Sequence, residues 1–533
     1  MKKYIIMVLS ALFVLSLAAC KSTAGGSSGG ESGDGIAYRT EVKDDYLQSL
    51  YLTDYVEDLS GTEREAFERQ GLDRQSAQYL GIAVSSYYSV KVDGEDVYTY
   101  MIAVAETKPH SVVFLDVSVD KFADGKELTV EVTVKDGVTV TEAIVLPEKL
   151  GVTAVVEGED KVSFSVGDYG NYTMVVNDYT DPDKAFTIFV RRPEYVEVPE
   201  GYTLIEYKPG LHFVDNIVLQ GNTVLYLHAG AFLVAKKPAG STGEISNAFI
   251  YANAADNLKI VGHGVIDFSQ LPWHARRGVY IGNSNGVEMN GVTLINASSW
   301  ASTFMYCKNL TVRDCIIFGY RTNSDAYAVC SCEDGEIVDC FARSGDDLFE
   351  VKTYSAPLKN ILFENCTAFP DNCRGFGLTQ ESNSLLTDIT YRNCSLLYQL
   401  NDWASHMSAF NIDAGEQGSI SGLTFEKCDL FYSKVYAVHI SVGENEWTMG
   451  VKGYDNSATN ITFRECSFKY PVSGRGFMKV RNNTRDINAI DNVFFDRCTI
   501  GEDGTPIASL STFPEGAVDY EGLTTPSSAF RFA

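Results

Sequence analysis

The phrase Asn360-Ile-Leu-Phe-Glu-Asn-Cys366 decides the fold, because close variants of it recur through the second half of the chain. Each variant opens with a turn residue, continues as a short β-rich run and ends at a cysteine; the seven cysteines are Cys315, Cys340, Cys366, Cys394, Cys428, Cys466 and Cys498. Successive members are 25, 26, 28, 34, 38 and 32 residues apart, a period within the range of solenoid repeats. Stacked turns of this kind predict a parallel β-helix with like residues in ladders along its axis.

The repeated cysteines are expected to pack in the core of that helix. An exported chain rich in cysteine often forms disulfides. Here the regular repeat instead favours inward-pointing thiols, which behave as small hydrophobic groups. Metal binding has less support, because Cys330-Ser-Cys332 lacks the usual ligand spacing and no matching histidine pair accompanies it. We therefore predict no metal site among the cysteines.

The pattern of apolar and polar residues is different before the repeats. Apolar and polar residues alternate over 128–134 and 161–166, and Asp93-Gly94 and Asp136-Gly137 mark turns between such runs. This pattern predicts an N-terminal β-sandwich over residues 36–195 and a β-helix over 196–533, with room for about twelve turns. Within the first domain, Asp44 to Ala83 is rich in helix-forming residues, so a short helical segment is also expected there.

The first 35 residues read as an export signal and a tether. Lys2 and Lys3 precede an apolar run too short to cross a bilayer, so residues 1–20 are predicted to be a signal peptide. Their ending, Leu17-Ala-Ala-Cys20, resembles the bacterial lipobox, which implies a lipid on Cys20 and a protein held outside the cytoplasm on the cell envelope. An ordinary cleaved signal is the alternative. Residues 21–35 are mostly Ser, Gly and Thr and predict a flexible tether.

Charge excludes one class of partner. The 533 residues include 70 acidic and 43 basic side chains, for a formal net charge of −27. Such a surface repels phosphate backbones, so nucleic acid is not an expected partner and a neutral or cationic ligand is favoured.

Carboxylates are concentrated in two neighbouring repeats. Asp325 precedes the pair Asp346-Asp347 by 21 residues, close to one turn, so the two positions are expected on adjacent turns of one face. Adjacent strands lie about 4.8 Å apart, and carboxyl groups roughly 5–9 Å apart suit glycoside hydrolysis. Crowded carboxylates also raise a pKa, as a general acid requires. Ordinary turn composition and a calcium site are the alternatives.

Five motifs follow one another along the chain: Gly262-His-Gly264-Val-Ile-Asp267, Asn296-Ala-Ser-Ser-Trp300, Asn323-Ser-Asp325, Gly345-Asp346-Asp347 and Val351-Lys352. As an ordered set they resemble glycoside hydrolase family 28, the polygalacturonases. The resemblance implies an all-β protein, a right-handed parallel β-helix, and an inverting hydrolase without a cofactor. It also implies that Asp346 is the general acid and that Asp325 and Asp347 activate water. The sandwich and the three aspartates are similar to those of the family 49 dextranases.

Two departures from the polygalacturonase pattern bear on the substrate. In Cys373-Arg374-Gly375, either Arg374 stands where that family has histidine or the loop is rearranged. Phe410-Asn411-Ile412-Asp413 falls where the family has its Arg-Ile-Lys clamp for a sugar carboxylate. A neutral polysaccharide or oligosaccharide is therefore expected rather than pectin. Against this, Lys352, Arg374, Lys479 and Arg481 could rebuild a basic patch.

Substrate binding is expected from Lys352, Arg374, Asn323, Trp273 and Trp403. The two tryptophans lie in polar, irregular surroundings and could stack on sugar rings. Two rival functions remain at this stage: a calcium-dependent polysaccharide lyase or epimerase on the same fold, and a non-catalytic surface protein that binds glycans.

Overall fold

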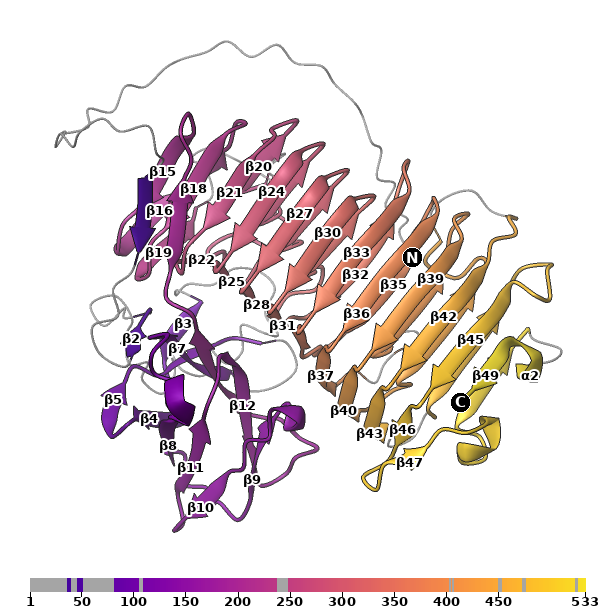
Figure 1. Ribbon diagram of the computed structural model, residues 1–533, viewed down its shortest axis with the longest axis horizontal. Coiled ribbons are helices and arrows are strands. Elements are labelled where there is room, and N and C mark those ends of the chain that lie inside the picture. Colours follow the sequence, from indigo (N-terminus) through magenta and orange to yellow (C-terminus); the bar gives the residue numbers. More distant parts are fainter. Residues whose placement is uncertain are drawn as a thin grey trace.

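The structure is a computed structural model that describes residues 36–39, 46–50, 81–104, 109–236, 248–401, 404, 407–448, 453–471, 476–522 and 526–533. Over these residues the protein is almost entirely β: an N-terminal sandwich packs against the side of a long parallel β-helix (Figure 1). Cys20, the predicted signal peptide and the predicted tether lie outside the described residues. None of the described helices is long and apolar enough to span a membrane.

The N-terminal sandwich consists of two sheets. One has the order β10 (Val155–Glu157), β11 (Lys161–Val166), β8 (Leu128–Val134), β4 (Tyr88–Val92) and β5 (Glu95–Val97). The other has the order β3 (Ile82–Val84), β6 (Tyr100–Ile102), β7 (His110–Val117), β13 (Phe186–Arg191), β12 (Gly170–Val176) and β9 (Ala143–Leu146), with β2 (Tyr46–Gln48) also paired to β7. The two predicted alternating runs are strands β8 and β11, and their buried positions alternate as expected.

The helical segment expected between Asp44 and Ala83 falls mostly on residues 51–80, which lie outside the described part. The described ends of that stretch are strands, β2 and the beginning of β3. Elsewhere the described helices are one short α-helix, α2 (Pro526–Ala529), and the single turns η2 (Ala123–Gly125), η3 (Glu148–Leu150) and η4 (Leu510–Thr512).

The β-helix has three long sheets, of 12, 12 and 11 strands. The first contains β15 (Thr203–Tyr207), β18 (Thr223–Leu227), β21 (Leu258–Val261), β24 (Asn285–Asn290), β27 (Lys308–Arg313), β30 (Glu333–Val338), β33 (Leu358–Glu364), β36 (Leu386–Arg392), β39 (Ile420–Glu426), β42 (Ala458–Arg464), β45 (Ile490–Asp496) and β49 (Phe530–Phe532). The second contains β16 (Gly210–Val214), β19 (Ala231–Ala235), β22 (Val265–Asp267), β25 (Thr293–Ile295), β28 (Ile316–Phe318), β31 (Phe341–Arg343), β34 (Thr367–Ala368), β37 (Ser395–Gln399), β40 (Asp429–Ser433), β43 (Ser467–Pro471), β46 (Thr499–Ile500) and β47 (Thr505–Pro506).

The third sheet contains β17 (Ile217–Val218), β20 (Ile250–Asn253), β23 (Val279–Gly282), β26 (Ser302–Met305), β29 (Tyr327–Cys330), β32 (Phe349–Thr353), β35 (Phe376–Ser382), β38 (Phe410–Ala414), β41 (Val438–Val442), β44 (Met478–Asn482) and β48 (Val518–Glu521). Strand β14 (Tyr195–Val198) pairs with β1 (Ile36–Arg39), and its Val196 and Val198 pack against the first turns of the helix. The predicted right-handed parallel β-helix after a β-sandwich is thus the observed fold class.

Each repeated phrase turns the chain with left-handed residues. Asn360 and Asn365 have φ values of 55° and 54°, a region that Asn enters more easily than most residues. The Asn393 side chain donates to Asn365 Oδ1 at 2.7 Å, so these turns are also linked from one coil to the next. The chain therefore bends where the phrase begins and again just before its cysteine.

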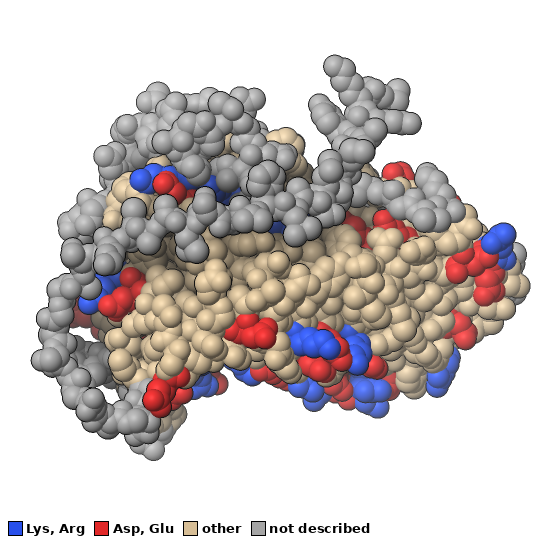
Figure 2. Space-filling view, turned by 90° about the horizontal axis from the view of Figure 1, so that it is seen from above, with Lys and Arg blue, Asp and Glu red and all other residues tan. Residues whose placement is uncertain are grey.

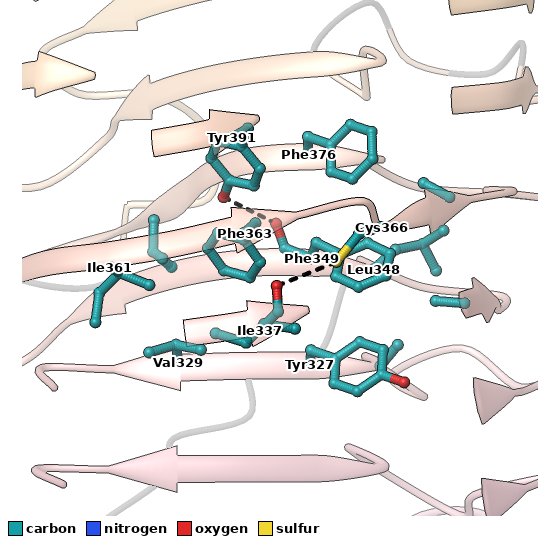
Figure 3. Close-up of a cluster of buried hydrophobic side chains, with 14 of the residues drawn as sticks. Tyr327, Val329, Ile337, Leu348, Phe349, Ile361, Phe363, Cys366, Phe376 and Tyr391 are labelled. Carbon is teal, nitrogen blue, oxygen red and sulfur yellow. Dashed lines mark hydrogen bonds between the residues drawn. The ribbon is translucent and has the colours of Figure 1, made fainter. Parts of the chain in front are cut away.

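The cysteines lie in the core as predicted. All eleven cysteines in the described residues are free and buried. Cys366 Sγ donates to the Ile337 carbonyl of the preceding turn at 3.4 Å (Figure 3), and Cys394 does the same to Phe363 at 3.6 Å. The thiols thus fill small spaces between coils and satisfy backbone carbonyls there.

An aromatic stack continues this core along the helix axis. Tyr391, Phe425, Phe463 and Phe495 occupy one position of successive first-sheet strands, with neighbouring ring centroids 4.9–5.0 Å apart. Their rings are close to parallel, at 7–18°. Figure 3 shows the start of this stack, where Phe363 and Tyr391 lie one above the other.

Phe425→Ala is expected to lower the free energy of unfolding by about 3–5 kcal/mol, because it opens a cavity between two rings in a fully buried column. Urea denaturation followed by fluorescence measures the loss. The control is Thr424→Ala on the outward face of the same strand, for which a change within about 0.5 kcal/mol is expected. Equal effects of the two substitutions would contradict the inward assignment of Phe425.

The sandwich packs on the outer face of the second sheet of the β-helix. Phe318, Phe341 and Phe369 project from this sheet toward Phe189 of β13, with Phe189–Phe341 centroids 5.1 Å apart. These residues and the sandwich interior form one hydrophobic cluster. The outer face of the first sheet is polar instead: it carries ion pairs between turns, such as Lys308–Glu333–Lys359. In Figure 2, acidic and basic side chains gather together along one long edge.

Candidate active site

The predicted catalytic carboxylates lie where the chain enters the third sheet. Asp325 precedes β29, and Asp346 and Asp347 precede β32 on the next turn. Ala301 N donates to the Asp325 carbonyl at 2.7 Å, and Ala326 N donates to the Asp347 carbonyl at 2.8 Å. Asp325 and Asp347 are therefore stacked on adjacent turns, and Asp346 lies beside Asp347.

Among the three aspartates, Asp346 is the candidate proton donor, because its carboxyl group is shifted toward the protonated form at neutral pH. Its Oδ2 accepts from Asn323 N at 2.6 Å and its Oδ1 from Asp347 N at 3.1 Å. The side chain is 8% exposed, against 2% for Asp325 and 3% for Asp347. Burial, together with the charges of Asp325 and Asp347, raises the pKa of Asp346 to about 8. Asp346 can thus donate a proton from the most open position of the three.

Arg374 forms a buried ion pair with Asp347. Its Nη1 donates to Asp347 Oδ2 at 2.7 Å and its backbone N donates to Asp347 Oδ1 at 3.0 Å. A second guanidinium nitrogen donates to Gln380 at 2.9 Å. The arginine is 5% exposed, so its charge is directed to the carboxylate and is largely shielded from solvent.

Lys352 joins three carboxyl groups. Its ammonium lies 3.1 Å from Asp325 Oδ2, 3.1 Å from Glu350 Oε2 and 3.6 Å from Glu381 Oε1. Although burial acts in the opposite direction, these three neighbours hold the pKa of Lys352 well above its usual value. Burial raises the pKa of Asp325, and Lys352 opposes that rise. Lys352 therefore carries its charge beside the water-activating candidate.

Trp300 closes this cluster from the preceding turn. The next residue, Ala301, donates from its backbone N to the Asp325 carbonyl at 2.7 Å, which places Trp300 one turn before Asp325 in the same stack. Lys352 Nζ lies 4.0 Å from the Trp300 ring centroid, and the Arg277 guanidinium lies 4.2 Å from it. Both distances are within the range of a cation–π contact.

Trp273 and Asn323 lie beside the candidate catalytic carboxyl groups, next to Asp346. Trp273 is 37% exposed, and its Nε1 donates to the Thr322 carbonyl at 2.8 Å. The neighbouring His274 contacts Asn323 Oδ1 through Nε2 at 2.7 Å. An exposed aromatic ring is thus fixed next to the residue that binds Asp346. Trp403 lies outside the described residues.

A buried ion pair connects the bases of the two site loops. Arg343 directly precedes the Asp346 loop, and Asp371 precedes Arg374. Arg343 Nε and Nη2 donate to the two Asp371 oxygens at 3.0 and 2.8 Å, and both side chains are fully buried. Arg343 Nη1 lies 2.8 Å from His110 Nδ1 of the sandwich. Because arginine can only donate, His110 accepts at Nδ1 and its Nε2–H donates to Thr187 at 2.6 Å.

The segment Phe410–Asp413, expected in place of the polygalacturonase basic clamp, also forms hydrogen bonds with side chains of other strands and loops. Asn411 Oδ1 lies 3.1 Å from His439 Nδ1. Asp413 accepts from Asn445 at 3.1–3.2 Å, and burial, partly offset by Arg374 and Arg481, raises the pKa of Asp413 to about 6. No lysine or arginine occupies either position.

In the described part of the chain, two groups of side chains have ligand atoms within 4.8 Å of one another: Asp346, Asp347 and Cys373, and Asp325, Asp347 and Glu350. A protein cation already contacts each group, through Arg374 on Asp347 and through Lys352 on Asp325 and Glu350. We therefore assign no metal ligands here.

Glu350 and Glu381 were missed by the sequence analysis. Glu350 and Lys352 are two residues apart on β32, so their side chains leave the same face of the strand. This spacing could have revealed Glu350. Glu381 lies in the irregular pairing between β32 and β35, whose register shifts after Val351, so strand periodicity does not locate it.

Comparison with known proteins gives a family match. Residues 215–469 match the model "Glycosyl hydrolases family 28". A "Probable polygalacturonase" of Vitis vinifera is 23% identical over 228 residues, which cover 36% of this chain and 46% of that protein. The chain thus spans about half the length of this curated relative.

Three solved structures share parts of the architecture. Polygalacturonase from Erwinia carotovora has a TM-score of 0.41 and 16% identity over 62% of this chain and 88% of its own. Endo-xylogalacturonan hydrolase from Aspergillus tubingensis has 0.43 and 14% over 62% and 91%. The GH87 α-1,3-glucanase from Streptomyces thermodiastaticus has 0.41 and 12% over 85% and 84%. Because these scores are low, the comparison rests on the family model, which confirms the resemblance expected from the motifs: residues 215–469 of this chain match glycosyl hydrolases family 28.

Proposed function

We propose that this protein is a glycoside hydrolase that cleaves a polysaccharide or oligosaccharide with inversion, with Asp346 as general acid and Asp325 and Asp347 activating the attacking water. The observation that carries the proposal is the set of three carboxyl groups on adjacent turns, in which burial and the charges of the other two raise the pKa of Asp346 to about 8. Two groups with divergent proton affinities are what acid and base roles require. The family match supports the same reaction class.

We further propose a neutral glycan as the substrate. The four basic residues that could have rebuilt a carboxylate clamp all contact protein carboxylates. Lys352 and Arg374 are buried on the aspartates. Lys479 lies 3.7 Å from Asp519, and Arg481 lies 3.5 Å from Glu446. A uronate polymer would have to compete with these acidic partners in an acidic protein.

The test is release of reducing sugar from dextran, α-1,3-glucan, pullulan, galactan, xylan and polygalacturonate. Cleavage of a neutral glycan is the expected result, and proton NMR of the first product should show the inverted anomer. Release from polygalacturonate alone would contradict the neutral-substrate proposal. An unsaturated product that depends on Ca²⁺ would indicate a lyase, and glycan binding without turnover would indicate a binding protein.

The raised pKa of Asp346 predicts an alkaline limb in the activity profile. The free enzyme is competent only while Asp346 holds its proton, so kcat/KM should fall about tenfold per pH unit above about pH 8. Initial rates measured from about pH 5 to about pH 10 report this limb. A profile that already falls through pH 5–6 would show that a different group supplies the proton.

We also propose that the protein is anchored to the bacterial cell envelope through a lipid on Cys20, as its lipobox-like ending suggests. Metabolic labelling with a fatty acid is expected to mark the wild-type protein and not the Cys20→Ala variant. Equal labelling of both would contradict the anchor.

A further inference from the structure

Glu350 is a buried carboxyl group whose Oε2 lies 3.1 Å from the Lys352 ammonium but which accepts no hydrogen bond from the described residues. It is 2% exposed, and among the described residues neither of its oxygens has a hydrogen-bond partner. In the third sheet its strand neighbours are Ala328 and Gly377, which carry no polar side-chain atom. Such a group normally costs free energy unless it is satisfied.

An oxygen of the neighbouring Asp325 shares this condition. Its Oδ1 also lacks a partner, while its Oδ2 accepts from Lys352. Ligand oxygens of Asp325, Asp347 and Glu350 lie within 4.8 Å of one another. Two unsatisfied acceptors of neighbouring carboxyl groups are both satisfied if one group carries a proton and donates it to the other.

The local charges favour that proton. The charged groups around Glu350 are the carboxyl groups of Asp325, Asp347 and Glu381 and the ammonium of Lys352. Arg374 neutralises Asp347, which leaves one ammonium for three other carboxyl groups. Lys352 opposes the effect of burial on Glu381 and lowers its pKa. In contrast, burial, with added repulsion from Asp325 and Asp347, raises the pKa of Glu350 well above its usual range.

We propose that Glu350 is a positioning residue: its neutral carboxyl group donates a hydrogen bond to Asp325 Oδ1 and, together with Lys352, fixes the carboxylate that activates water. This inference rests on the proposed hydrolase function. Glu350 is too buried to contact a glycan, so it acts through Asp325 and should affect kcat with little change in KM.

The kinetic test compares two variants. Glu350→Gln keeps a neutral donor of the same shape and should retain kcat within about twofold. Glu350→Ala leaves Asp325 Oδ1 unsatisfied and should lower kcat by roughly 5- to 100-fold with KM unchanged. Glu333→Gln, in an exposed ion pair of the first sheet, is the matched control and should behave as wild type.

A spectroscopic test does not depend on activity. In the Asp346→Asn background, infrared spectra at neutral pH should show a protonated carboxyl band that disappears when Glu350→Gln is added. If the wild-type enzyme cleaves no glycan, the hydrolase proposal fails while this band still reports the proton on Glu350. Absence of the band, or a Gln variant as impaired as the Ala variant, would overturn the inference. A thermal midpoint raised by added CaCl₂ in wild type but not in Glu350→Gln would also overturn it, in favour of a cation.

Discussion

Asp346→Asn is expected to lower kcat on the cleaved glycan by about 10²–10⁴-fold, because the amide cannot protonate the departing glycosidic oxygen. The substitution keeps the shape of the side chain. Its amide oxygen can still accept from one of the two backbone donors, Asn323 N and Asp347 N, whereas its NH2 group cannot accept from the other. Substrate binding should change little, so the loss falls on kcat rather than KM. Steady-state kinetics on the glycan identified by the panel measures both constants.

Stability distinguishes this effect from unfolding. In the native protein Asp346 has a pKa of about 8, above its unfolded value, so the stability that its proton contributes is lost as pH rises toward about 8. The Asn variant has no such loss, and its thermal midpoint at pH 7–8 is expected to equal or exceed that of wild type. If Asp346→Asn lowers kcat by less than about tenfold, Asp346 is not the general acid.

Arg343→Met is expected to lower the free energy of unfolding by about 3–5 kcal/mol, because it leaves Asp371 buried without its cation. Both side chains are fully buried, and the pair connects the loop that carries Asp346 to the loop that carries Arg374. The substitution also removes the donor to His110, so the contact between the sandwich and the β-helix is weakened at the same place. Urea denaturation, or soluble yield if the variant does not accumulate, measures the effect.

Two further variants make this expectation specific. Arg313→Met removes an exposed ion pair with Glu336 and should cost about 0–1 kcal/mol. The double variant Arg343→Met with Asp371→Leu replaces the pair by apolar groups and should recover part of the loss. An Arg343→Met protein as stable as wild type would show that the buried pair does not hold the two domains and loops together.

The fold could be predicted because its signals are local and repeated. Positions such as Asn360 and Cys366 recur in seven successive coils, and each of these coils contacts its neighbours in the same way, so one phrase describes this part of the helix. The sandwich strands β8 and β11 were also predictable from their alternation. Which face of the helix the sandwich covers was not predictable, because Phe189 and Phe341 meet through contacts between distant segments.

The site was predictable only in part. One repeat separates Asp325 from Asp346, so the sequence alone places them on adjacent turns. The partners of Lys352 and Arg374 were not evident: both were expected to bind substrate, and the structure places them on Asp325 and Asp347. The role proposed for Glu350 likewise depends on three carboxyl groups converging from different turns.

The coil repeat, the inward direction of the thiols and the spacing of the catalytic candidates follow from the amino-acid sequence alone, because backbone turns and strand periodicity act over a few residues. Which charged groups meet depends instead on the three-dimensional packing of the chain. Burial strengthens electrostatic interactions and makes unpaired groups costly, so the proton on Asp346 and the pairing of Lys352 and Arg343 depend on which distant residues are brought within a few ångströms.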